Sequence, residues 1–152
     1  MACTANDRDA PPRHCAWWLQ RLSRFSRSVI TRWASPDFAG TGTARARANL
    51  LLGENLSLTQ REQFHECGYF TVTGGETGNC YRIWRGYQMN VEEIDKNGKR
   101  LHVLCFMPEG HLAQGDVMLA QKIALELFEF DALKIANTMP PHLSRFPERH
   151  EA

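Results

Sequence analysis

Four short strand-like segments stand directly before one long apolar helical segment in this chain. The strand-like segments alternate apolar and polar residues and are separated by turn-forming residues. They cover residues 69–73, 80–87, 88–95 and 99–107, and the helical segment covers residues 117–129. Successive strands followed by a helix are typical of an α+β fold. We therefore predict a mainly antiparallel four-stranded sheet with a covering helix after it.

Turn and capping residues mark the limits of these elements. Asn97-Gly98 predicts a type I′ hairpin turn between the last two strands, because that turn needs positive φ at both central residues. Asp116 is a suitable N-cap for the covering helix. The second half of the last strand is apolar on both faces, which predicts a central place in the sheet.

A pair of helices is predicted before the sheet. The first covers about residues 44–53. The second begins after Ser57, which can form a capping box with Gln60. It ends at Gly68, because glycine adopts the left-handed C′ conformation without penalty. Phe64 is its expected inward residue.

The covering helix carries only a narrow polar stripe. The stripe consists of Lys122, Glu126 and Glu129. A helix with this pattern is buried on most sides. We therefore expect Leu119, Ile123 and Leu127 in the main core.

Composition divides the rest of the chain into segments. Residues 1–13 are polar with paired prolines, so we expect them to be disordered. Residues 14–34 predict a basic amphipathic helix, and residues 35–43, rich in Gly, Thr and Ser, predict a linker. The α+β domain is expected over residues 44–139 and a disordered tail over residues 140–152.

Charge is distributed unevenly along a chain whose formal net charge is +1. Residues 1–48 hold eight Arg and three Asp, a net charge of +5, whereas residues 49–152 hold ten basic and fourteen acidic residues, a net charge of −4. A basic segment on an acidic body can contact nucleic acid, an anionic membrane surface or an acidic protein surface, and charge alone leaves all three open.

The amphipathic segment 14–34 is the first candidate binding site. Its aromatic residues recur at helical spacing with arginines beside them. The candidate partner-binding residues are Trp17, Trp18, Phe25, Trp33, Arg21 and Arg24. Such a stripe suits docking on a protein partner, a membrane interface or nucleic acid. It equally suits packing on its own domain or on a second copy.

The second strand supplies the next candidate site. Arg82 and Trp84 should share one face, and Arg85 and Tyr87 the other, because strand side chains alternate. These residues are a candidate contact for an anion or nucleic acid, although their division between two faces is unlike a base-stacking platform. The alternative is that each arginine packs its apolar stem beside an aromatic ring.

Cysteine and histidine spacing predicts no metal site and no cofactor. The five cysteines are odd in number and form no C-x-x-C pair, which argues against a secreted disulfide framework. In the conceivable zinc set of His65, Cys67, Cys80, Cys105 and His111, only His65 and Cys67 lie close together in the sequence, whereas structural zinc sites present paired ligands. These two side chains should also point to different sides of a helix, so a Cys/His hydrolase would need a base from His102 or His111.

The loop before the covering helix is the last candidate site. Glu109, His111 and Asp116 lie in it, and loops held by rigid elements often carry function. The structural alternative is that Pro108 and Gly110 shape the turn and Asp116 caps the helix. The glycines between residues 74 and 79 stand between strands, where they predict a turn rather than a phosphate cradle.

Several short sequence patterns lie between residues 45 and 137. They are Tyr81-Arg82-Ile83, Asn90-Val91, Leu104-Cys105-Phe106, Pro108-Glu109-Gly110, Gly115-Asp116, the segment from Met118 to Glu126, and Ala136-Asn137. With these patterns the block resembles an uncharacterised group of small proteins from bacteria and their prophages. The resemblance implies a bacterial or phage origin and assigns no activity.

Three functions are consistent with these residues. The leading prediction is a non-enzymatic binding or adaptor module that docks on a partner, or associates with itself, through residues 14–34. The alternative is a nucleic-acid-binding regulator that uses the basic arm with Arg82 and Arg85, and a small Cys/His hydrolase comes third. No apolar run reaches the roughly 18 residues of a membrane-spanning helix, and we expect a cytoplasmic protein.

Overall fold

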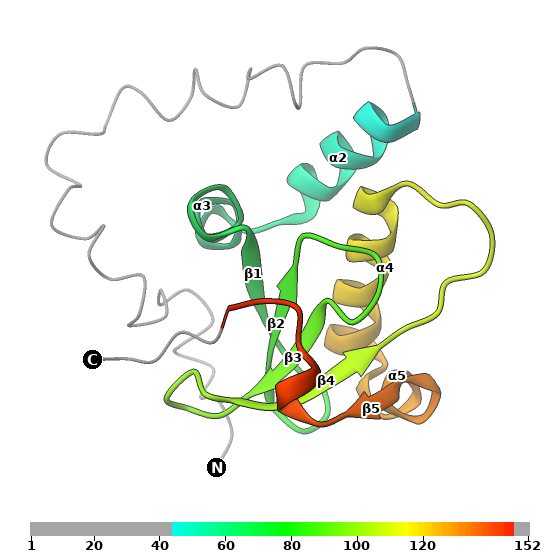
Figure 1. Ribbon diagram of the computed structural model, residues 1–152. Helices are drawn as coiled ribbons and strands as arrows, with labels where there is room; N and C mark the ends of the chain where they lie inside the picture. The colour runs from blue at the N-terminus through cyan, green and yellow to red at the C-terminus, as the bar shows by residue number, and fades with distance from the viewer. Residues whose placement is uncertain (1–43, 148–152) are drawn as a thin grey trace, which may run out of the picture.

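Residues 44–147 are the part of the chain that the computed structural model describes (Figure 1). In chain order they form α2 (Ala44–Asn55), α3 (Leu58–Cys67), β1 (Tyr69–Thr73), β2 (Cys80–Trp84), β3 (Val91–Ile94), β4 (Arg100–Cys105), α4 (Gln114–Leu127), α5 (Glu129–Ile135), β5 (Asn137–Met139) and the 3₁₀ turn η3 (Pro141–Leu143). The predicted segments 1–13, 14–34 and 35–43 lie outside the described residues.

Helix α3 has the limits that its sequence predicts. The Gln60 amide donates to the Ser57 hydroxyl (3.2 Å), and the Ser57 amide donates to the Gln60 side chain (3.1 Å). Gly68 follows the helix with a φ of 75°, and its amide donates to the Phe64 carbonyl (3.2 Å). Phe64 is buried, as expected. Local capping chemistry is therefore enough to define this element.

The sheet is antiparallel throughout, with the strand order β1-β2-β3-β4-β5. The predicted α+β class is confirmed, but the described sheet has five strands rather than four. Strand β5 was not predicted because its three residues carry no run of β-branched or aromatic side chains. Its pairing with β4, in which Met139 faces Val103, gives β4 a neighbour on each side and confirms the central place predicted for it.

Strands β2 and β3 are shorter than predicted, and residues 85–90 connect them irregularly. Asn90 holds the ends of this connection together. The Trp84 amide donates to the Asn90 carbonyl (2.7 Å), and the Asn90 side-chain amide donates to the Trp84 carbonyl (3.0 Å). A side chain thus takes the place of continued strand pairing.

The hairpin between β3 and β4 is present as predicted, but its turn type differs. Gly98 has a φ of 78°, and Asn97 is not among the positive-φ residues. The Asp95 carboxylate instead accepts hydrogen bonds from the amides of Asn97 (2.8 Å) and Lys99 (2.9 Å). The prediction of a type I′ turn is therefore wrong, because an aspartate side chain stabilises a longer turn in its place.

Helix α4 begins earlier than predicted. Its N-cap is Ala113, and Asp116 lies in the first turn, so the prediction that Asp116 caps the helix is wrong. The first turn packs on α2, where a Cβ added to Gly115 would lie 2.5 Å from the carbonyl atoms of Ala48. The Asp116 carboxylate still stabilises α4, because a negative charge in the first turn interacts favourably with the helix dipole.

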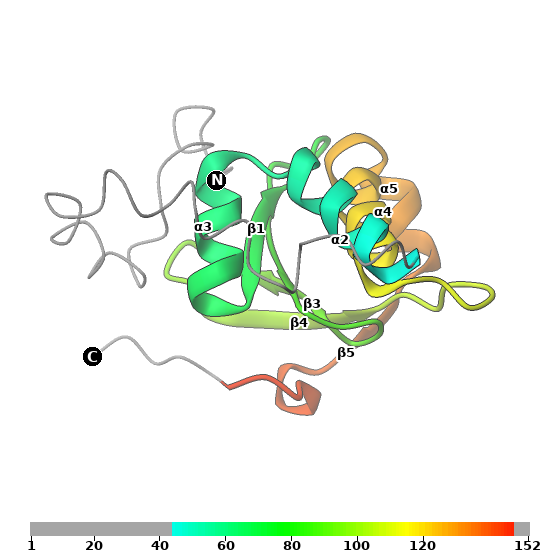
Figure 2. The same ribbon diagram turned by 90° about the horizontal axis from the view of Figure 1, so that it is seen from above.

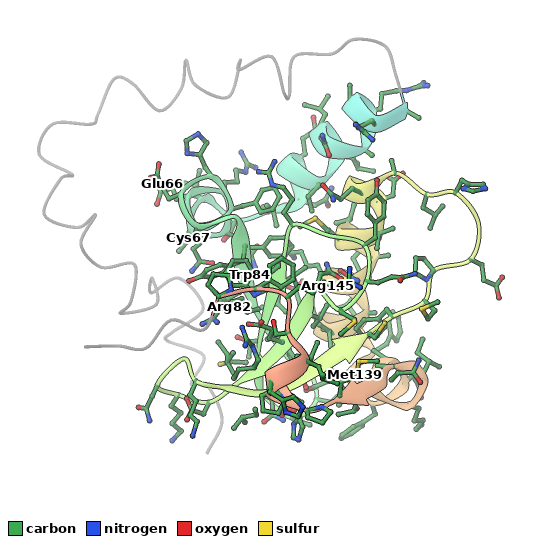
Figure 3. All side chains as sticks on the ribbon, in the orientation of Figure 1. Glu66, Cys67, Arg82, Trp84, Met139 and Arg145 are labelled. Carbon is green, nitrogen blue, oxygen red and sulfur yellow. The ribbon has the colours of Figure 1, made fainter. Side chains whose placement is uncertain are left out.

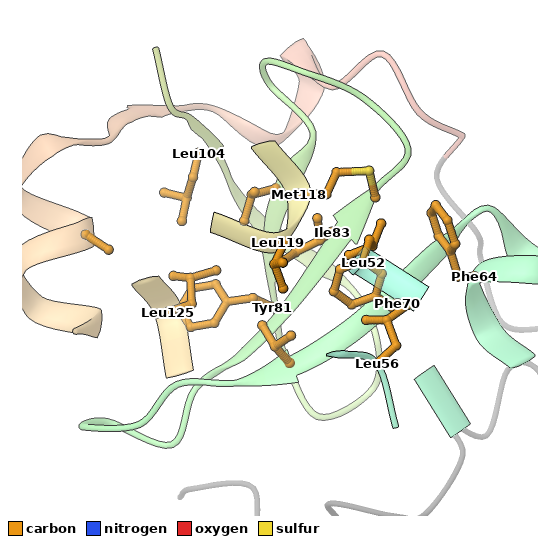
Figure 4. Packing of buried hydrophobic residues seen from close by; sticks show 13 residues of the cluster. Leu52, Leu56, Phe64, Phe70, Tyr81, Ile83, Leu104, Met118, Leu119 and Leu125 are labelled. Carbon is orange, nitrogen blue, oxygen red and sulfur yellow. The ribbon is translucent and has the colours of Figure 1, made fainter. Parts of the chain in front are cut away.

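Helices cover one face of the sheet, and the chain after β5 crosses the other. Seen from above, α4, α2 and α5 lie over one side of the strands, and the segment after β5 lies on the opposite side (Figure 2). The main core fills the space between helices and sheet (Figure 4). No helix between residues 44 and 147 is long and apolar enough to cross a membrane.

The inward face of α4 differs from the predicted one. Leu119 is buried as expected, but Ile123 and Leu127 are 42% and 63% exposed. Gln121 points inward instead, because its side-chain amide and that of Asn90 exchange two hydrogen bonds of 2.9 Å each. At 3.6 residues per turn, an inward Gln121 turns Ile123 outward.

We expect Ile123→Ala to lower the free energy of unfolding by no more than about 1 kcal/mol, because the side chain is already half in solvent. Leu119→Ala on the same helix is the matched comparison and should cost about 2 to 5 kcal/mol. Urea unfolding of both variants measures the difference. Equal losses would contradict the orientation of α4 described above.

Candidate functional site

Residues 140–147 form a strap across the sheet face opposite the helices, although composition predicts a disordered tail from residue 140. The Ser144 hydroxyl donates to Glu92 Oε1 (2.8 Å). The Arg100 guanidinium donates to the carbonyls of Pro141 (3.4 Å) and Phe146 (3.0 Å). Buried charged residues of the sheet thus supply the hydrogen bonds that hold the strap. The composition of residues 140–147 does not indicate these hydrogen bonds, because their partners lie elsewhere in the sequence.

Three charged residues are buried under the strap. The Glu92 carboxylate lies between two guanidinium groups, 3.3 Å from Arg82 Nη1 and 2.6 Å from Arg100 Nη2. Arg82, Glu92 and Arg100 are only 3%, 0% and 6% exposed. Strand pairing positions them, because Arg82 lies directly opposite Glu92 in the β2–β3 ladder.

Aromatic rings complete this face. Trp84 and Phe146 stack in parallel with their centroids 4.7 Å apart, and Tyr69 packs against Trp84 at 4.7 Å. The Arg82 guanidinium lies 4.8 Å from the centre of the Tyr69 ring, a cation–π distance. We call Tyr69, Arg82, Trp84, Glu92 and Arg100 together the strap face.

Two hydrogen-bond donors of the strap face lack an acceptor within residues 44–147. They are Arg82 Nε and Trp84 Nε1. A buried donor without an acceptor lowers stability, and nearly all buried polar groups in folded proteins are paired. These two atoms are therefore candidates for contact with a ligand.

The four candidate residues predicted on the second strand differ in burial. Arg82 and Trp84 belong to the strap face, where Glu92 and the strap occupy them. Arg85 and Tyr87 are exposed residues of the connection between β2 and β3, and the Arg85 guanidinium lies 4.6 Å from the centre of the Phe64 ring. The structure therefore does not bring Arg82 and Arg85 together into one basic surface.

A second buried carboxylate, that of Glu129, holds the loop between β1 and β2. The amides of Glu76 (2.9 Å) and Thr77 (2.7 Å) and the hydroxyl of Tyr81 (2.7 Å) donate to it, as does the Thr77 hydroxyl. The glycine-rich loop therefore presents amide groups as an anion cradle does, but an internal carboxylate fills it. The turn predicted for residues 74–79 is present.

Hydrogen bonding decides the pKa of Glu129. Burial on its own would raise this pKa, but the hydrogen bonds from Thr77, Tyr81 and Glu76 outweigh burial and hold the pKa below its ordinary value. Burial, followed by the hydrogen bond to Glu129, raises the pKa of Tyr81 above its ordinary value. The Glu129 carboxylate is therefore ionised at neutral pH, and its role is structural.

The loop before α4 does not form a constellation with these groups. Glu109 and His111 are exposed, and Asp116 is partly buried in the first turn of α4. The arm residues Trp17, Trp18, Phe25, Trp33, Arg21 and Arg24 lie outside the described residues.

The cysteines and histidines of the described region are dispersed. Cys105 is a free thiol, whereas Cys80 is disulfide-bonded, which the odd cysteine count did not predict. His65 and His102 lie 3.0 Å from carboxylates of Glu66 and Glu93. Within residues 44–147, no group of three His, Cys, Asp or Glu side chains is arranged to hold a metal ion.

Four large apolar side chains are exposed between the last residue of α4 and the last residue of α5. They are Leu127, Phe128, Phe130 and Ile135, with exposed fractions of 63%, 58%, 51% and 76%. We call them the apolar ridge. The expectation that Leu127 lies in the core is wrong, because the polar stripe does not mark the solvent side: Glu129, one of its three residues, is fully buried.

Comparison with known proteins gives no relative from which a role could be transferred. A scan against family models, a search of curated proteins and a search of solved structures each return no match to this chain.

Proposed function

We propose that this protein is a non-enzymatic binding module that docks on a protein partner through the apolar ridge and the segment 14–34. The observation that carries the proposal is the exposure of the apolar ridge. Isolated exposed apolar residues are common, but Leu127, Phe128, Phe130 and Ile135 fall within nine consecutive residues. Exposed apolar groups of this kind mark interaction surfaces.

The engagement of the buried polar groups also favours a binding role. The carboxylates of Glu92 and Glu129 are held by the hydrogen bonds described above, and Asn90 pairs with Gln121. A nucleophile, base or acid must instead be free to reach a substrate. The nucleic-acid alternative loses Arg82, which is buried against Glu92, and keeps only Arg85 and the arm.

We expect Leu127→Ser with Phe130→Ser to abolish partner capture or self-association, because buried apolar anchors dominate interface energies. Trp18→Ala with Trp33→Ala should have the same effect. Leu58→Ser is the matched control, since Leu58 is 77% exposed on α3, away from the ridge. Pull-down and sedimentation velocity on the full chain measure the outcome.

Charge substitution separates the two classes of partner. Arg21→Gln, Arg24→Gln and Arg27→Gln together should matter less than loss of the tryptophans. If binding is instead weakened mainly by loss of the arginines, and the slope of affinity against salt concentration flattens by about one for each arginine, phosphate contact replaces apolar docking as the function.

A further inference from the structure

The exposed side of α4 is apolar and leads to the apolar ridge. Ala120, Ile123 and Leu127 recur at spacings of three and four residues, so they share one side of the helix. Ala120 is exposed, and Ile123 and Leu127 are 42% and 63% exposed. Helix α4 therefore presents an apolar surface to solvent over about two turns, and this surface ends at the ridge.

Residues 14–34 are joined to the described structure close to the start of α4. The described chain begins at Ala44 of α2, and Figure 2 shows α2 beside α4. The closest approach lies between Ala48 and Gly115, about one helical turn from Ala44. A flexible chain as long as residues 35–43 spans about 17 Å on average, so it allows the end of the segment to reach the first turn of α4.

The helix predicted for this segment matches α4 in length. Its aromatic residues extend from Trp18 to Trp33, a separation of about 22 Å along a helix. Helix α4 has 14 residues and is therefore about 21 Å long. A helix that packs antiparallel to α4, with Trp33 near the first turn, places Trp18 at the apolar ridge.

The segment and the surroundings of the ridge carry opposite charges. Residues 14–34 hold four arginines and no acidic residue, a net charge of +4. The Glu76 carboxylate lies at the ridge, because it accepts a hydrogen bond from the Phe130 amide (2.6 Å). The charged residues around the ridge are four acidic and two basic ones, a net charge of −2: Glu76, Glu126, Glu129, Asp131, Lys122 and Lys134.

We propose that residues 14–34 cover the apolar ridge of their own chain, as a helix antiparallel to α4, until a partner displaces them. A short linker gives the segment an effective concentration in the millimolar range, which favours its own ridge over that of a second copy. This inference rests on the proposed function, because it names what covers the docking surface before a partner binds. Its tests need no partner, whereas the pull-down does, so either proposal can fail without the other.

A labelled peptide tests the contact on the full chain. The peptide WWLQRLSRFSRSVITRWA copies residues 17–34. The parent chain should bind it weakly, because its own segment occupies the ridge. A chain with Trp18→Ala and Trp33→Ala should bind it at least about tenfold more tightly by fluorescence anisotropy, because its own segment no longer competes. Equal affinity of the two chains would overturn the proposal.

Further substitutions in this double variant locate the peptide. Leu127→Ser with Phe130→Ser should abolish the tenfold gain, whereas Leu58→Ser, at an exposed leucine of α3, should keep it. Ala120→Arg adds bulk and positive charge to the exposed side of α4 and should weaken binding about fivefold or more. Leu58→Arg is its matched control. Unchanged binding in the Ala120→Arg chain would overturn the placement along α4.

Tryptophan fluorescence tests the contact without an added ligand. Trp84 is 5% exposed and lies beside Arg82 on the strap face, away from α4 (Figure 3), so quenching by acrylamide reports on the other three tryptophans. Leu127→Ser with Phe130→Ser should raise the quenching constant by about twofold or more, because the segment is released, and Leu58→Ser should leave it unchanged. In the parent chain the constant should not depend on protein concentration. An unchanged constant in the ridge variant, or protection that appears only at high concentration, would overturn the proposal.

Discussion

Replacement of Gly115 by Ala should lower the free energy of unfolding by at least about 3 kcal/mol. Helix propensity alone predicts the opposite sign, because alanine in a helix is about 1 kcal/mol more favourable than glycine. The reversal comes from the contact of α4 with α2, where the added Cβ would lie 2.5 Å from the carbonyl carbon and oxygen of Ala48. These are backbone atoms, which cannot rotate away as a side chain could, so the two helices must separate.

Urea unfolding followed by circular dichroism measures this loss. Gln114→Ala is the matched control, since it changes the neighbouring residue in the same first turn and should stay within about 0.5 kcal/mol. A Gly115→Ala chain that is more stable than the parent would show that the helices do not approach as closely as described.

The elements that could be predicted from sequence are those that local chemistry defines. The limits of α3 follow from Ser57, Gln60 and Gly68, which act within one turn of the helix. The hairpin at Gly98 is equally local. Strand β5 could not be predicted, because its three residues become a strand only through pairing with β4. Contacts with distant residues, rather than its own propensity, define it.

Which side of α4 is buried could not be predicted either, for the same reason. The sequence pattern counts apolar residues and places Ile123 inward, but the position of Gln121 depends on Asn90, a residue 31 positions away. A buried pair of amides reverses the expected side of the helix. Only the tertiary arrangement identifies a glutamine as part of the interior.

The candidate site was predicted in part. Alternation along β2 places Arg82 and Trp84 on one face, and the strand pairing agrees with this. Glu92 and Arg100 could not be predicted as their neighbours, because the register of β2, β3 and β4 decides which charged residues meet. The strap escaped prediction for the related reason that its partners, Glu92 and Arg100, lie about 50 residues earlier.

Removal of the Glu129 carboxylate should have the other large effect. We expect Glu129→Ala to lower the free energy of unfolding by about 4 kcal/mol, because it leaves the amides of Glu76 and Thr77 and the hydroxyl of Tyr81 without their buried acceptor. Glu126→Gln is the matched control, since its pair with Lys122 is a partly exposed i,i+4 pair on the helix surface and should contribute no more than about 1 kcal/mol.

The same carboxylate gives stability a defined dependence on pH. The pKa of Glu129 is lower in the folded protein than its ordinary value, so the unfolded chain takes up the proton first as pH falls. The contribution of Glu129 is therefore complete above the ordinary glutamate pKa of about 4.3 and is lost as pH falls through the lower, folded-state pKa. Glu129→Gln cannot ionise but retains one acceptor oxygen, so it should cost less than Glu129→Ala and should flatten the fall in stability below about pH 4.3. Urea unfolding at a series of pH values compares the two chains, and an equally steep fall in Glu129→Gln would assign the acid sensitivity to other carboxylates.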